Sequence, residues 1–191
     1  MANSQDTEKN RIRFKVLDAL YSISKGYKYT FIPFDILYKE LQSNSDREQE
    51  VILEGFQLLR NYGLVDTKAL ATASITHQGI KKLESLILGS DEHTTPYLSY
   101  TDEPQTNKNE IRTIQNQRTL FLKKAYELSE GSNKKPISAF KIMDILGYDK
   151  ETLERIYYYL EEEGLIKTFA LGGEFTITQK YIEQQGVDRS P

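Results

Sequence analysis

An internal repeat constrains the fold of this 191-residue chain more than any other feature of its sequence. The stretch GLVDTKALATASITHQGIKKLE begins at Gly63, and GLIKTFALGGEFTITQKYIEQ begins at Gly164 with nearly the same order of apolar and polar positions. Further upstream, ALYSISKG at 19–26 corresponds to KAYELSEG at 124–131. A preserved order with small changes of offset indicates two copies of one structural unit, each about 70 residues long.

Three helices are predicted at the start of each copy. In copy one, Ile12, Val16 and Leu20 recur at helical spacing in the first helix. A short second helix follows in both copies, and Ser138 is expected to cap it in copy two. The third helix presents an apolar stripe to the core, formed in the two copies by Ile52, Phe56 and Leu59 and by Leu153, Ile156, Tyr157 and Leu160.

After each third helix the pattern changes to that of a β-hairpin. The segments LVDT and SIT in copy one, and LIKT and FTIT in copy two, predict paired strands joined by a turn. Thr76 and Thr178 follow, and a threonine oxygen there can accept a hydrogen bond from the first turn of a closing helix. Each copy is therefore predicted to run helix, helix, helix, hairpin, helix.

This order resembles the winged helix-turn-helix superfamily. The residues that carry the resemblance are the GL[IV] step after the third helix and the ITxxG step after the hairpin. Copy two reads ITQKY where copy one reads ITHQG, so its closing helix departs from the pattern. The resemblance implies a mainly α fold with small β-hairpins (α+β), organised as two tandem winged helix-turn-helix domains.

The expected organisation follows from the copies and from the join between them. Pro96 and Pro104 prevent a continuous helix through the join. From about Asn109, either one long amphipathic helix continues into copy two or a short separate helix precedes it. We expect a flexible N-terminus at 1–10, a first domain at 11–88, a linker at 89–108, a second domain with its leading helix at 109–187, and a C-terminal tail at 188–191.

The resemblance also implies a way of binding DNA, in which the third helix enters the major groove. At 100° per residue from Leu153, the outward face in copy two includes Glu151, Arg155 and Glu162, so carboxylates would approach the phosphates. Residues 1–90 carry 12 Lys or Arg against 11 Asp or Glu, whereas residues 91–191 carry 13 against 17. These charges oppose a general affinity for nucleic acid, although dimerisation can cluster scattered cations and arginine can read guanine. The residues expected in base or groove contact are Arg47, Gln49, Lys150 and Arg155, and those expected on phosphates are Arg11, Arg13, Lys134, Lys135 and Lys141.

Protein binding is the alternative function. Tyr158 and Tyr159 are expected at or near the surface of an otherwise acidic helix, and tyrosine is enriched in protein interfaces. Val51 and Leu53 flank the apolar stripe of copy one, which widens its apolar face. Under this hypothesis these four residues anchor a protein partner or a homodimer. Of the two functions, we expect a DNA-binding protein similar to transcriptional regulators, with double-stranded DNA as its partner, and the alternative is a protein-interaction adaptor or scaffold.

Few residues are available for catalysis or metal binding. The chain has no cysteine and two histidines, His77 and His93, and it lacks the GxxxxGK[ST] and HExxH motifs. We therefore expect no catalytic residues, no metal and no cofactor. The polar start MANSQDTEKN lacks the features of a signal peptide, and no run of about 18 apolar residues occurs. A cytoplasmic protein without a membrane-spanning helix is expected.

Overall fold

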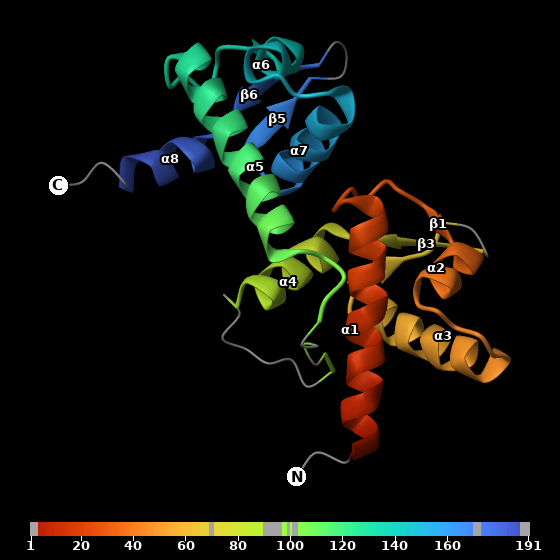
Figure 1. Cartoon of the computed structure of the whole chain (residues 1–191). Coiled ribbons are helices and arrows are strands. Elements are labelled where there is room, and N and C mark those ends of the chain that lie inside the picture. The colour runs from red at the N-terminus through yellow and green to blue at the C-terminus, as the bar shows by residue number, and fades with distance from the viewer. Residues whose placement is uncertain are drawn as a thin grey trace. The chain divides into compact units, whose positions relative to one another are not determined.

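The computed structural model describes residues 4–68, 71–89, 97–98, 100, 103–169 and 173–187. Within them the chain is mainly helical with small antiparallel sheets, as expected for an α+β fold, and it divides into unit 1, Met1–Ile111, and unit 2, Arg112–Pro191 (Figure 1). His93, the tail at 188–191 and the centres of both hairpin turns lie outside the described residues.

Unit 1 folds around a first helix that is longer than expected. Its elements are α1 Ser4–Ser24, β1 Ile32–Pro33, α2 Phe34–Glu40, α3 Asp46–Asn61, β2 Val65–Asp66, β3 Thr72–Ile75 and α4 His77–Leu88. We expected a flexible segment at 1–10, but α1 begins at Ser4, and an i,i+3 ion pair between Glu8 and Arg11 at 3.9 Å supports its early turns.

The core of unit 1 lies between α1 and the elements packed against it, α3, β3 and α4. The apolar stripe predicted for the third helix is buried, because Ile52, Phe56 and Leu59 are at most 7% exposed. The buried apolar side chains of the other elements include Phe14, Leu17, Leu20, Ile32, Leu37, Ile75, Ile80 and Leu83.

Unit 2 repeats this order of elements. They are α5 Lys108–Ser129, which begins four residues before the unit boundary, β4 Ile137–Ser138, α6 Ala139–Leu146, α7 Lys150–Glu162, β5 Ile166–Thr168, β6 Glu174–Ile177 and α8 Gln179–Val187. The leading segment is one continuous helix, which decides between the two alternatives for residues after 109. The core of unit 2 includes Phe121, Ala125, Ile142, Leu153, Ile156, Leu160, Phe175, Ile177 and Tyr181.

Each unit contains a strand that the sequence reading missed. The sheets are three-stranded, in the orders β1-β3-β2 and β4-β6-β5, rather than two-stranded hairpins. Ile32 pairs with Ala73 in unit 1, and Ile137 pairs with Phe175 in unit 2. These added strands are two residues long, so they show no alternation of apolar and polar residues.

The predicted caps of three helices are present. The hydroxyl oxygens of Thr76, Thr178 and Ser138 accept hydrogen bonds from the backbone N–H groups three residues later, at 3.0, 3.4 and 3.4 Å. The two threonine hydroxyls also donate to the carbonyls of Gly63 at 2.6 Å and Gly164 at 2.7 Å. Each threonine thus ties the start of the closing helix to the glycine that follows the third helix.

The expected linker at 89–108 is packed against unit 1 where the structure describes it. Leu98 is 3% exposed. The buried Asp18 carboxylate of α1 accepts hydrogen bonds from the backbone N–H of Gln105 at 2.6 Å and of Thr106 at 3.1 Å. This segment therefore forms part of unit 1.

Candidate functional site

The start of α3 is fixed by a capping box that its sequence encodes. Ser45 accepts a hydrogen bond from the backbone N–H of Glu48 at 3.3 Å. The Glu48 Oε2 atom in turn accepts from the backbone N–H of Asn44 at 2.7 Å and of Ser45 at 3.2 Å. The pKa of Glu48 is lowered from its ordinary value, first by the hydrogen bond from the Asn44 backbone and then by hydrogen bonding with Ser45, because both favour the charged carboxylate.

The turn between α2 and α3 carries a group of polar and basic side chains that we call the corner surface. Gln42 in this turn has a positive φ of 54°, and its carbonyl accepts a hydrogen bond from the Asn44 side chain at 2.9 Å. Lys39 and Arg47 are exposed on either side of the turn, and Gln49 is half-buried. The corner surface is defined as Lys39, Gln42, Asn44, Arg47 and Gln49.

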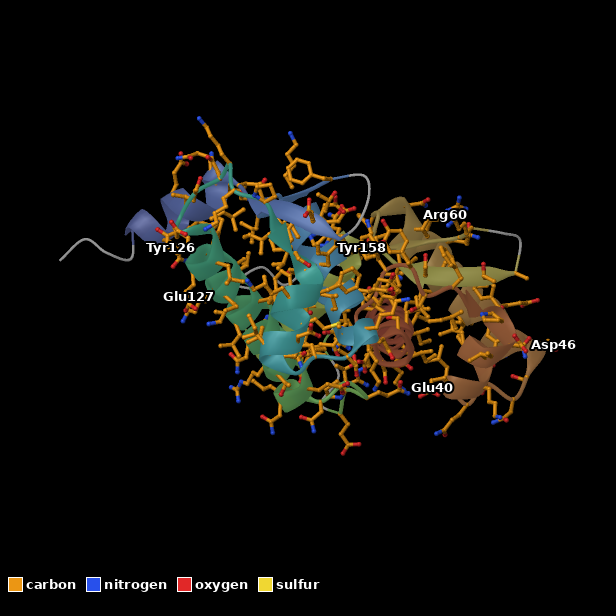
Figure 2. The ribbon with its side chains drawn as sticks, turned by 90° about the horizontal axis from the view of Figure 1, so that it is seen from above. Glu40, Asp46, Arg60, Tyr126, Glu127 and Tyr158 are labelled. Carbon is orange, nitrogen blue, oxygen red and sulfur yellow. The ribbon has the colours of Figure 1, made fainter. Side chains whose placement is uncertain are left out.

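Carboxylates border the corner surface. Asp35, Asp46 and Glu50 are exposed, and Asp46 projects outward from the beginning of α3 (Figure 2). Phosphate groups approaching this surface would meet cations, amides and carboxylates together. The surface is therefore suited to hydrogen bonding more than to simple charge attraction.

The other predicted residues of unit 1 lie in two different settings. Arg11 forms the ion pair with Glu8, and Arg13 donates to the side-chain oxygen of Asn10 at 2.6 Å while lying half-buried beside α3. Leu53 is 39% exposed, whereas Val51 is half-buried and lines a pocket with Arg47. The structure thus brings Arg47 and Val51 together on one flank of the first half of α3, whereas Gln49 lies on another flank, beside Lys39 and Gln42.

In unit 2, the cations predicted for α7 are engaged within the unit. The Arg155 guanidinium donates to the side-chain oxygen of Gln117 on α5 at 3.5 Å and lies half-buried. Lys150 is close to Glu154, at 3.7 Å. The outward direction expected for Arg155 was therefore wrong, because α5 lies against that flank of α7.

The tyrosines of α7 face different surroundings. The guanidinium carbon of Arg118 lies 3.3 Å from the ring centre of Tyr159, so Tyr159 packs onto α5. Tyr158 is half-buried and its ring meets that of Tyr157 edge to face. Neither Tyr158 nor Tyr159 is among the exposed large apolar side chains. Each therefore offers a protein partner less surface than the sequence led us to expect.

The predicted lysines before and within α6 are exposed. Lys135 forms an ion pair with Glu130, whereas Lys134 and Lys141 have no ion-pair partner among the described residues. Lys141 follows the capped start of α6, where its backbone N–H donates to Ser138.

An exposed aromatic group near the β5–β6 hairpin was missed by the sequence analysis. Phe140 is 47% exposed and Phe169 is 44% exposed. A Cβ atom on Gly173 would lie 2.7 Å from the Phe140 ring, and the Phe169 N–H donates to the Glu174 carbonyl at 3.1 Å, so both phenylalanines flank the same end of the hairpin. We call Phe140 and Phe169 the hairpin aromatic patch. Periodicity could not reveal it, because its members come from different elements.

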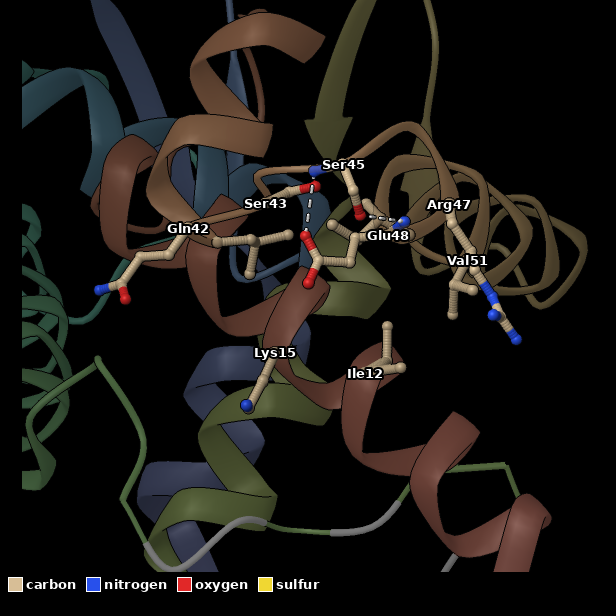
Figure 3. A pocket seen from close by; sticks show the side chains of 10 residues that line it. Ile12, Lys15, Gln42, Ser43, Ser45, Arg47, Glu48 and Val51 are labelled. Carbon is tan, nitrogen blue, oxygen red and sulfur yellow. Dashed lines mark hydrogen bonds between the residues drawn. The ribbon is translucent and has the colours of Figure 1, made fainter.

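A pocket of about 400 Å³ lies between α1, the end of α2 and the start of α3 (Figure 3). Lys15 and Arg47 stand at opposite sides of it, with Ile12, Glu48 and Val51 between them (Figure 3). The sequence offered no signal for this pocket, since its lining combines three separate segments.

Within the described ranges, no group of three His, Asp or Glu side chains is arranged to hold a metal ion. In the same part of the chain, no helix combines the length and apolar character needed to cross a bilayer. Comparison of the chain with protein-family models, with curated proteins and with solved structures finds no match.

Proposed function

We propose that the chain is a tandem winged-helix protein that acts as a DNA-binding regulator, with unit 1 as the domain that contacts double-stranded DNA. The order of elements in each unit supports the winged-helix reading, since a three-helix core is followed by a hairpin and a closing helix. The hairpin takes the place of the wing, and the α2–α3 turn takes the place of the helix-turn-helix corner.

The observation that carries this proposal is the composition of the corner surface. Arg47 and Lys39 can contact phosphates or guanine, and the side-chain amides of Gln42, Asn44 and Gln49 match the hydrogen-bonding edge of adenine. Neither Lys39 nor Arg47 has an ion-pair partner within the described part of the chain. They remain available for an anionic ligand.

The exposed carboxylates set the expected strength of binding. Asp46 and Glu50 stand beside the cations of the corner surface and repel phosphates, so non-specific binding should be weak. A dissociation constant at the weak end of about 10⁻⁴ to 10⁻⁶ M is expected for random sequence near physiological salt. Specific binding requires a DNA sequence whose bases form hydrogen bonds with the side-chain amides of the corner surface.

The test is fluorescence anisotropy of a labelled random-sequence duplex titrated with the full chain at low and moderate salt. The double variant Lys39→Gln, Arg47→Gln should lose most binding, and the slope of log K against log salt should become shallower by about 1.8 if both side chains contact phosphates. The matched control is Lys108→Gln, Lys123→Gln, which removes two exposed cations from α5. Equal binding by both double variants would contradict a corner surface that contacts DNA.

A second candidate function is supported by the hairpin aromatic patch of unit 2. Two exposed phenylalanines at one end of a hairpin provide apolar area that water solvates poorly, as in a protein interface. We take a second copy of the chain as the occupant to be tested. Sedimentation velocity of Phe140→Ser, Phe169→Ser should then show less self-association than wild type, whereas Leu120→Ser, an exposed leucine of α5, should behave like wild type.

A further inference from the structure

The pocket between α1 and α3 combines an apolar wall with charged groups. Ile12 and Val51 supply apolar surface from two helices (Figure 3). Ile52 of α3 and Leu41 in the turn after α2 add to it. Its volume of about 400 Å³ falls within the range of sites that hold drug-sized molecules. Its apolar wall distinguishes it from the corner surface, where Lys39, Gln42, Asn44 and Gln49 line a separate, polar hollow.

The charged groups of the pocket differ in how far they are already engaged by other residues of the protein. Lys15 and Arg47 are exposed at the rim and have no ion-pair partner among the residues that the structure describes. Glu48 also lines the pocket, but its Oε2 atom already accepts two backbone N–H groups of the α3 cap. The two cations therefore outnumber the one carboxylate, and that carboxylate keeps Oε1 to accept a further hydrogen bond.

From this arrangement we propose that unit 1 binds a small organic anion in this pocket. The ligand has an apolar body of about one or two rings, a carboxylate and a hydrogen-bond donor. The body covers Ile12 and Val51, the carboxylate pairs with Lys15 or Arg47, and the donor points to Glu48. Charge complementarity selects an anion over a cation or a neutral compound of the same shape.

This site does not depend on the proposed binding of DNA. It faces α1, and only Gln42 and Arg47 belong both to its lining and to the corner surface. Ligand binding can therefore be measured without nucleic acid, so either proposal can fail while the other holds.

The probes are three indoles of one shape: indole-3-acetate, which is anionic, tryptophol, which is neutral, and tryptamine, which is cationic. The chain contains no tryptophan, so indole emission excited near 295 nm reports the ligand alone. Anisotropy of that emission gives the affinity of the full chain for each compound. Methyl chemical shifts of Ile12, Val51 and Ile52 give the location.

We expect indole-3-acetate to bind at least threefold more tightly than either analogue, with saturable shifts centred on the three methyl-bearing residues. Lys15→Gln and Arg47→Gln should each reduce this preference, whereas Lys123→Gln, which removes an exposed cation of α5 outside the pocket, should retain it. Circular dichroism establishes that the variants remain folded. Equal affinity for the three indoles, a preference for tryptamine, or shifts centred elsewhere would overturn the proposal.

Discussion

Replacing Gly79 by alanine should destabilise unit 1, because the backbone leaves no room for a side chain there. Gly79 lies in the first turn of α4, and an added Cβ would stand 2.0 Å from the Leu64 carbonyl oxygen and 2.9 Å from Cγ1 of Ile75. The Leu64 carbonyl cannot simply retreat, since it accepts a hydrogen bond from the Thr76 N–H at 3.1 Å. Either α4 shifts or this hydrogen bond is lost.

The expected magnitude follows from three opposing contributions. Overpacking costs about 1–3 kcal/mol, and weakening the hydrogen bond costs about 1 kcal/mol more. Alanine recovers up to about 1 kcal/mol through its higher helix propensity. The net loss should be about 2 kcal/mol, which lowers the ratio of folded to unfolded unit 1 by about thirtyfold.

Urea unfolding followed by methyl resonances measures this loss in the intact chain. Ile75 reports unit 1 and Ile177 reports unit 2, which avoids treating two units as one transition. Gly55→Ala is the matched control, because Gly55 is also inside a helix but its added Cβ would approach no atom more closely than Cγ of the flexible Arg13 side chain, at 3.4 Å. Gly55→Ala should be neutral or stabilising by up to about 1 kcal/mol. An unchanged unfolding midpoint for Gly79→Ala would refute the close approach of α4 to Leu64.

Three further outcomes are expected. Asp18→Asn should speed amide hydrogen exchange at Gln105 and Thr106, because a neutral amide replaces the buried carboxylate that accepts both N–H groups; unchanged exchange would exclude this anchor. Because the pKa of Glu48 is lowered in the folded protein, the stability that its carboxylate contributes is complete above pH 4.5 and is lost as the pH falls through the folded pKa. An NMR titration of the Glu48 carboxyl carbon should therefore show a midpoint below 4.5, and a midpoint at or above 4.5 would contradict the cap. Thr178→Ala should cost about 1 kcal/mol in urea unfolding of unit 2, whereas Thr119→Ala, an exposed position within α5, should cost less; equal losses would argue against capping.

The sequence predicted those parts of the fold that depend on contacts between residues close together in the chain. Thr76 and Ser138 cap their helices because each hydroxyl accepts from an N–H three residues away, a contact that spacing alone specifies. Leu153, Ile156 and Leu160 are buried because helical periodicity places them on one side of α7. These predictions needed no knowledge of the rest of the molecule.

The errors concern partners that lie far away in sequence. Periodicity placed Arg155 outward relative to Leu153, but it could not show that Gln117 of α5 stands beside that flank. It likewise could not pair Tyr159 with Arg118. Arg155 and Tyr159 both contact α5, and the sequence does not give the distance between α5 and α7.

The two units differ most at the surface that would meet a ligand, which bears on why the chain keeps both. Their core helices and sheet orders correspond, yet α3 has 16 residues and α7 has 13, so α3 extends nearly one turn further. Measured from the glycines that follow them, Gly63 and Gly164, the extra residues lie at the start of α3, where the capping box and Arg47 are found. Unit 2 has no counterpart of that turn, and its exposed phenylalanines lie at the hairpin instead. A shared core with different exposed ends is what two copies would need to bind different ligands.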